Sequence, residues 1–192
     1  MYKEYYKLNK NPFQITPDQE VFFASKGHKK ALSYLQYGLS QGGGFIVITG
    51  DIGTGKTTIV KNLIAGLDAK THIAKQIVTT NLEEQDLMEM VCETFDLMSK
   101  GLTKAALLNQ FQAFLISAHK LGRKVVLIVD EVQNLPAKTV EELRMLSNFQ
   151  IENRPLMQSF LVGQKEFVAT LQGEDMEQLR QRVIASCHLG PL

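Results

Sequence analysis

The chain has 192 residues, which is enough for one domain with a sizeable hydrophobic core and too few for two full domains. Hydrophobic residues make up 44% and charged residues 21%, a balance that excludes a disordered or fibrous chain. There are 21 Lys and Arg residues against 20 Asp and Glu residues, and the net charge of +1 gives no overall attraction to nucleic acid or to an anionic membrane.

The cysteines and the apolar segments exclude further classes. Cys92 and Cys187 lie far apart, without a CxxC or Cys/His cluster, so the sequence indicates neither a zinc site nor a disulfide framework. The longest apolar run, residues 125–129, is far shorter than the roughly 18 residues of a membrane-spanning helix. The first residues lack the apolar stretch of a secretory signal, so we expect a cytoplasmic location.

Helices and strands alternate along the chain. In chain order we expect a helix over 29–39, a strand over 45–49, a helix over 56–67, a strand over 72–80, helices over 85–98 and 103–121, a strand over 125–129, a helix over 139–149, a strand over 159–162, a helix over 165–171 and a strand over 185–189. The strand at 125–129 shows no polar alternation, which is typical of a strand buried on both faces of a parallel sheet. The order predicts an α/β fold with a mostly parallel sheet between two layers of helices.

Two groups of side chains are interpreted as structural. In the helix expected over 85–98, an apolar stripe runs from Leu87 to Met98, and we expect it to face the core. Near the start of the chain, Lys26, His28, Lys29 and Lys30 form a basic cluster that we interpret as a solvated surface. None of the histidines shows the paired spacing of a metal site.

One segment between a predicted strand and a predicted helix carries a phosphate-binding motif. The pattern GxxxxGK[ST] is matched by Gly50, Asp51, Ile52, Gly53, Thr54, Gly55, Lys56 and Thr57. Glycines allow successive backbone N–H groups to converge on a phosphate, and the helix N-terminus favours its negative charge. We expect Lys56 to reach the β- and γ-phosphates of a nucleotide and Thr57 to bind Mg²⁺. Thr58 either contacts the α-phosphate or caps the helix.

Two acids follow the buried strand directly. Asp130 and Glu131 lie at the carboxyl end of the strand over 125–129, where open α/β sheets bind ligands. We expect Asp130 to hold Mg²⁺ through its water shell and Glu131 to act as the general base on the attacking water. The alternative, a pair of acids that caps the next helix, is disfavoured by the phosphate-loop motif.

Three further polar residues have weaker signals. Gln164 follows the strand over 159–162 at the same edge of the sheet, where it is either a site residue or an ordinary loop residue. Arg180 and Arg182 lie near the end of a helical segment, and from their spacing alone a solvated helix face is the favoured interpretation.

Six segments carry a resemblance to a known family. They are Asn-Pro-Phe at 11–13, the phosphate-loop region at 44–58, Asp-Glu-Val-Gln-Asn-Leu at 130–135, Glu-Glu-Leu-Arg-Met-Leu-Ser-Asn-Phe at 141–149, Val-Gly-Gln at 162–164 and the stretch at 179–192. Together they resemble the AAA+ ATPases of the general secretion pathway protein A type, over the whole chain. Within that group the chain is most similar to the secretion ATPases of exosortase and exopolysaccharide loci in Gram-negative bacteria.

The resemblance implies an AAA+ P-loop fold with a five-stranded parallel sheet in the order 5-1-4-3-2. It assigns Lys56 and Thr57 to the first nucleotide motif, Asp130 and Glu131 to the second, and Gln164 to a sensor of the γ-phosphate. Arg182 becomes the first candidate for an arginine finger and Arg180 the second. Such a finger acts on the ATP of a neighbouring protomer, so the active form is expected to be a homo-oligomer.

The resemblance also sets the expected domain organisation. Residues 1–192 form one nucleotide-binding base domain, in which residues 1–43 are an N-terminal segment and helix on the adenine side. Base contacts are expected within residues 11–30. The small helical lid of AAA+ proteins would follow residue 192, so we expect it to be absent from this chain and hydrolysis to be weak. Attachment to the cell envelope cannot be carried over from larger relatives.

The leading functional hypothesis is a Mg²⁺-dependent ATPase that acts on a protein partner in an envelope or polysaccharide export system. Its expected location is the cytoplasm, with peripheral association at the inner membrane. One alternative is an ATP-dependent DNA-binding module similar to the transposition helper ATPases, although the near-neutral charge makes nucleic acid an unfavoured partner. The other is a regulatory switch that binds ATP and hydrolyses it slowly.

Overall fold

A computed structural model describes residues 2–7, 25–80 and 82–190 of the chain. Its main feature is a parallel sheet of five strands in the order β2-β3-β6-β1-β7. These strands are β1 (Phe45–Gly50), β2 (His72–Val78), β3 (Lys124–Asp130), β6 (Met157–Gly163) and β7 (Val183–Leu189). Numbered along the chain, this order is the expected 5-1-4-3-2, and the predicted α/β class is confirmed.

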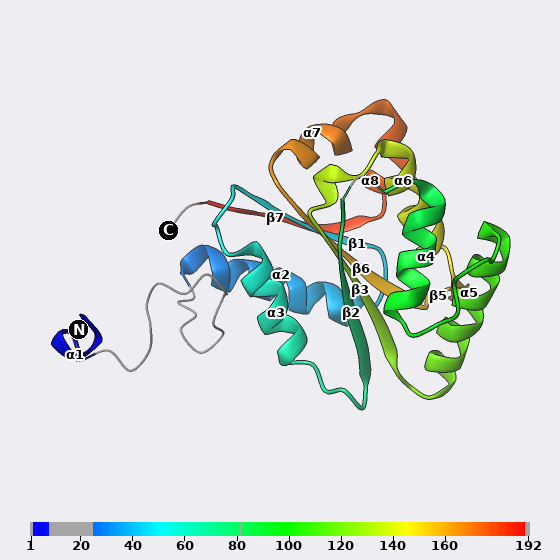
Figure 1. Cartoon of the computed structure of the whole chain (residues 1–192), viewed down its shortest axis with the longest axis horizontal. Helices are drawn as coiled ribbons and strands as arrows, with labels where there is room; N and C mark the ends of the chain where they lie inside the picture. The colour runs from blue at the N-terminus through cyan, green and yellow to red at the C-terminus, as the bar shows by residue number, and fades with distance from the viewer. Residues whose placement is uncertain (1, 8–24, 81, 191–192) are drawn as a thin grey trace.

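Helices cover both faces of the sheet (Figure 1). They are α2 (Lys26–Gln41), α3 (Lys56–Ala65), α4 (Glu84–Thr94), α5 (Lys104–Lys120), α6 (Ala137–Leu146), α7 (Glu166–Gln172) and α8 (Glu177–Arg180), with short 3-10 turns η2 (Val132–Asn134) and η3 (Glu174–Met176). A further short helix, α1 (Tyr2–Tyr5), lies near the start of the chain. Helices α2 and α3 pack on one face, and α4 to α8 supply the helical side chains of the core on the other. The sheet is therefore the central layer of three.

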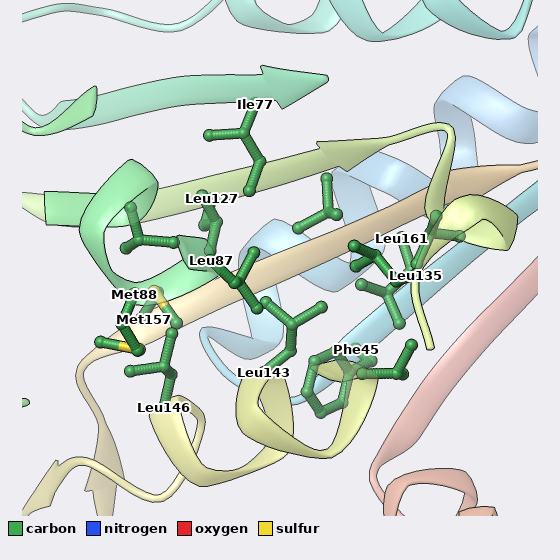
Figure 2. Close-up of a cluster of buried hydrophobic side chains, with 14 of the residues drawn as sticks. Phe45, Ile77, Leu87, Met88, Leu127, Leu135, Leu143, Leu146, Met157 and Leu161 are labelled. Atoms are coloured by element: carbon green, nitrogen blue, oxygen red, sulfur yellow. The ribbon is translucent and has the colours of Figure 1, made fainter. Parts of the chain in front are cut away.

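Alternation along the strands explains how one sheet supports two cores. In β1, Phe45 and Val47 belong to the core on the α4–α6 side, while Ile46 and Ile48 belong to the core under α2 and α3. Figure 2 shows the larger core, in which leucines of α4 and α6 meet side chains of β1, β3 and β6. Truncating one of these buried side chains to alanine is expected to cost about 2–5 kcal/mol of unfolding free energy.

The helix expected over 85–98 ends earlier than its apolar stripe suggested. Helix α4 ends at Thr94, and Asp96 follows with a left-handed φ of 60°. The backbone N–H groups of Phe95 and Leu97 donate back to carbonyls of the last helical turn, which closes the helix. Beyond that turn the helical period no longer applies, so the expectation that Met98 faces the core is wrong. Its side chain is 72% exposed.

The helix expected over 139–149 ends three residues early, and a short hairpin follows it. Helix α6 ends at Leu146, and strands β4 (Gln150–Ile151) and β5 (Arg154–Pro155) pair in antiparallel fashion before β6. Glu152 and Asn153 form its turn, with φ angles of 48° and 62°. Strands of two residues carry too little periodicity to be found in a sequence. The turn brings the chain back so that β6 enters the sheet beside β1 and β3.

Candidate functional site

The loop between β1 and α3 contains the predicted phosphate loop, and its backbone follows the glycine pattern. β1 ends at Gly50 and α3 begins at Lys56. Gly53 and Gly55 have φ angles of 81° and 83°, a conformation that residues with a side chain rarely adopt. The loop leads directly from the carboxyl end of a strand to the N-terminus of a helix, where backbone N–H groups and the helix dipole favour an anion.

Lys56 lies inside this loop. Its side chain is buried, and Nζ donates hydrogen bonds to the backbone oxygens of Gly50, at 2.8 Å, and Asp51, at 2.9 Å. A buried ammonium group is stable only with such partners, because water no longer solvates its charge. The loop thus holds the positive charge of Lys56 beside the N-terminus of α3.

A histidine from α2 supports the loop from outside. His28 Nε2 lies 3.0 Å from the backbone oxygen of Thr54, and Nδ1 lies 2.8 Å from Ser25 Oγ. Ser25 caps α2 and starts the helix earlier than expected, which places His28 in the first turn beside the loop. The interpretation of the basic cluster as a solvated surface is therefore wrong for His28, which is 3% exposed, although Lys29 and Lys30 are exposed.

Thr57 and Asp130, the two predicted Mg²⁺ ligands, are in direct contact. Thr57 Oγ1 donates to Asp130 Oδ2 at 3.0 Å, and Gln76 Nε2 donates to the same oxygen at 2.9 Å. The other carboxylate oxygen accepts from the backbone N–H of Glu131 at 3.0 Å. Burial raises the pKa of the Asp130 carboxyl, and the hydrogen bond from Thr57 partly opposes that rise. A hydroxyl and a carboxylate side by side are oxygen donors of the kind that Mg²⁺ prefers.

Glu131 faces the phosphate loop. Its φ of 56° is left-handed, so the chain turns sharply after β3 and enters the 3-10 turn η2. Glu131 lines a cavity of about 280 Å³ together with Gly53, Lys56, Thr57 and other residues of the loop. A carboxylate at this position is placed to accept a proton from a water molecule in the cavity.

Gln164 lies at the carboxyl end of β6, next to the phosphate loop, because Gly163 pairs with Thr49 of β1. Its backbone N–H donates to Gln133 Oε1 at 2.9 Å. The next residue, Lys165, makes an exposed ion pair with Asp51 at 3.2 Å. The segment that holds Gln164 thus contacts both nucleotide motifs.

Arg180 and Arg182 have different surroundings. Arg180 lines a cavity of about 860 Å³ with Thr49, Lys165 and His188, whereas Arg182 lies at the amino end of β1. The backbone oxygen of Arg182 accepts from the N–H of Phe45 at the start of β1, and its Nη1 donates to Ser147 Oγ at 2.9 Å. Arg180 Nη1 donates to the backbone oxygens of Leu171, at 2.7 Å, and Gly173, at 3.1 Å. Arg180 therefore caps the end of α7, whereas Arg182 lies at the end of the sheet where β1 and β7 begin.

Sequence reasoning missed three polar residues that hold the site together. Besides Gln76 and Gln133, Thr79 Oγ1 donates to the backbone oxygens of both Asp130 and Glu131 at 2.9 Å. Gln133 offers a local signal, because it lies two positions after Glu131, whereas Gln76 is one of three polar residues in β2 and does not stand out in the sequence. The expected base contacts within 11–30 fall mostly outside the described residues, which lack 11–24.

Comparisons with known proteins agree with this geometry. A family model described as an AAA domain matches residues 39–171. General secretion pathway protein A of Aeromonas hydrophila is 37% identical over the whole of this chain, which spans 35% of the length of that relative. In the part of the chain that the structure describes, no helix is both long and apolar enough to cross a membrane.

Solved structures support the fold. The ADP form of the ORC2 protein of Aeropyrum pernix matches with a TM-score of 0.66 and 17% identity, over 94% of this chain and 51% of that one. Cdc6p of Pyrobaculum aerophilum matches with a TM-score of 0.67 and 14% identity, over 93% and 48% of the two chains. At such identities the likeness concerns the fold alone. With the family match and the phosphate-loop geometry, it leads to one conclusion: the chain belongs to the AAA domain family and is an AAA+ P-loop ATPase.

Proposed function

We propose that this chain binds ATP with Mg²⁺ and uses hydrolysis to rearrange a protein partner in a bacterial secretion or polysaccharide export system. The observation that carries the nucleotide part is that Lys56, Thr57 and Glu131 line one small cavity, with Asp130 hydrogen-bonded to Thr57. The secretion part rests on the similarity to general secretion pathway protein A, of which this chain spans about a third. The export of exopolysaccharide is the finer hypothesis drawn from the sequence resemblance.

Each side chain of the site has its own proposed role in nucleotide binding or hydrolysis. Lys56 and the backbone N–H groups of residues 53–57 bind the β- and γ-phosphates, Thr57 and Asp130 hold the metal, and Thr58 lies at the first turn of α3 beside the α-phosphate. Bound Mg²⁺ would supply positive charge against the phosphate oxygens. Glu131 accepts the proton of the attacking water, and Gln164 contacts the γ-phosphate from the end of β6.

Assembly is part of the proposed mechanism. Arg182 lies at the start of β7, and the phosphate loop follows the far end of β1. A strand of six residues separates these edges by about 20 Å, which an arginine side chain cannot span. Arg182 therefore acts on ATP bound by another copy of the chain. The proposed place of action is the cytoplasmic side of the inner membrane, where the partner system would lie.

The experiment is steady-state ATP hydrolysis per protomer across a wide range of protein concentration, with Glu131→Gln as the blank. We expect the specific activity to rise with concentration, because neighbours complete the site. A flat rate near the blank beside tight ATP binding would overturn the hydrolysis proposal in favour of the slow switch. ATP-dependent DNA binding that weakens steeply with salt would instead favour the DNA-binding module.

A further inference from the structure

Gln133 joins the two parts of the site that respond to the γ-phosphate. Its Nε2 donates to Glu131 Oε2 at 2.5 Å, and its Oε1 accepts from the backbone N–H of Gln164 at 2.9 Å. One side-chain amide thus contacts both the proposed base and the backbone of the proposed sensor. We propose that Gln133 is a positioning residue that orients Glu131 and makes this orientation depend on the position of the Gln164 segment. This inference rests on the proposed function.

The local backbone explains why this side chain can reach both partners. Glu131 is left-handed, and the 3-10 turn of residues 132–134 begins directly after it. The turn folds the chain back, so that a residue two positions later lies over the carboxylate of Glu131. Asn134 Nδ2 fixes the turn by donating to the backbone oxygen of Thr79 at 3.2 Å. The backbone turn that carries Gln133 is therefore held by a hydrogen bond besides the two that the Gln133 side chain makes.

The chemistry of the bridge requires an amide. Glu131 as a base is a carboxylate and needs a donor, while the N–H of Gln164 needs an acceptor. Glutamine supplies both from one planar group. Glutamate at position 133 would keep an acceptor for Gln164 and place a second negative charge beside Glu131, and methionine would fill a similar volume with neither function. Comparing these two substitutions therefore distinguishes the hydrogen bond to Glu131 from the hydrogen bond to the backbone of Gln164.

The end of β6 leaves room for the Gln133 side chain. A Cβ on Gly163 would lie 2.8 Å from Gln133 Oε1 and 2.8 Å from Val132 Cγ1, so only glycine lets the turn pack against the end of β6. The ion pair between Lys165 and Asp51 ties the same segment to the phosphate loop. A shift of Gln164 toward a phosphate would therefore move its backbone N–H, and with it the amide that holds Glu131.

The bridge leaves the reacting groups free. It occupies one carboxylate oxygen of Glu131, so the second oxygen can accept the proton of the attacking water. It uses the backbone of Gln164, so the side chain of Gln164 remains available for the γ-phosphate. Gln133 itself is not among the residues that line the cavity at the phosphate loop. Its effect on the reaction is consequently indirect, through the orientation of Glu131.

The test compares Gln133→Met and Gln133→Glu with the matched control Gln178→Met, which changes an exposed glutamine of α8. We expect both Gln133 variants to bind a fluorescent ATP analogue within about twofold of wild type and to lose about 10- to 100-fold in kcat. The control should change neither. In the Glu131→Gln background, Gln133→Met should cause little further loss, because both substitutions act on one step. Unchanged kcat in both Gln133 variants, or full additivity with Glu131→Gln, would overturn the role of Gln133.

A second readout does not depend on turnover. Hydrogen exchange of the backbone amides of residues 131–135 should differ between the ATP-bound and ADP-bound wild-type protein, because the bridge transmits contact with the γ-phosphate. Gln133→Met should abolish that difference while both nucleotides still bind. The same difference in wild type and variant, or none in wild type, would overturn the inference. A wild-type rate equal to that of Glu131→Gln would overturn the proposed hydrolysis, and the exchange experiment would still decide the role of Gln133.

Discussion

The two edges of the sheet have opposite characters. At the carboxyl edge, polar side chains from β2, β3, α3 and the loops around them bond to one another or to backbone oxygens. They include the buried charged groups of Lys56 and Asp130. At the amino edge, Arg182 donates to the Oγ of Ser147, the residue that follows the last turn of α6. One edge is a connected network around a cavity, and the other presents an arginine at the far end of the strands.

Under the proposed function, this difference means that a single chain holds only part of the site. Each residue proposed to bind phosphate or metal, and the proposed base, belong to the carboxyl edge. The arginine proposed to stabilise the transition state lies about 20 Å away across β1. Substitutions at the carboxyl edge should therefore act within one protomer. Substitutions of Arg182 should depend on which copies are mixed.

The largest effect is expected for Lys56→Ala at the carboxyl edge. It removes the buried positive charge of the phosphate loop, so nucleotide affinity should fall by more than about 100-fold and turnover should become undetectable. Calorimetric titration with ATP measures the affinity, with Lys70→Ala, an exposed lysine near β2, as the control. ATP affinity equal to that of wild type would contradict the assignment of the loop.

The second-largest effect on activity is expected for Arg182→Ala, which tests whether the amino edge acts on the site of another protomer. Loss of a finger is expected to lower kcat by about 10³-fold in the assembled protein while ATP affinity is kept. Mixing this variant with Lys56→Ala should restore part of the activity, since each variant supplies the half that the other lacks. Arg154→Ala, which changes an exposed arginine of β5, is the matched control and should leave kcat unchanged. Arg180→Ala tests the second candidate: we expect lower thermal stability, because Arg180 caps α7, and a loss of kcat as large as that of Arg182→Ala would assign the finger to Arg180 instead. If no mixture restored activity, a finger acting between copies would be wrong.

Glu131→Gln should remove the proposed base and leave the phosphate-binding and metal-binding residues of the carboxyl edge in place. The expected result is ATP affinity close to that of wild type and a loss of about 100-fold or more in kcat. Single-turnover hydrolysis with excess protein separates this step from product release. Turnover close to wild type would contradict the role of Glu131 and leave Asp130 and Thr57 as the metal ligands.

The contrast between the edges also explains what the sequence could predict. The strands and the phosphate loop were predictable because apolar runs, helical periods and a glycine pattern are local signals. The strand order came from a family resemblance, since pairing between distant strands leaves no periodic trace. The partners of His28, Gln76 and Gln133 could not be predicted even where the sequence drew attention to the residue, because they depend on which segments meet in space. Met98 was misplaced for a related reason, since the closing turn at Asp96 overrides a periodicity that continues in the sequence.

The smallest effect concerns the free-energy cost of burying the Asp130 carboxylate at the carboxyl edge. Its pKa is raised in the folded protein, chiefly by burial, so between the unfolded and folded values the native state binds more protons than the unfolded state. This contribution to stability is complete below the unfolded pKa near 4 and is lost as the pH rises through the folded pKa. Thermal unfolding without nucleotide should show a decline over that window that is absent in Asp130→Asn and present in Arg182→Ala. If the unfolding temperatures of wild type and Asp130→Asn changed with pH in the same way, the Asp130 carboxylate would be solvated in the folded protein. Its burial would then cost no free energy of folding.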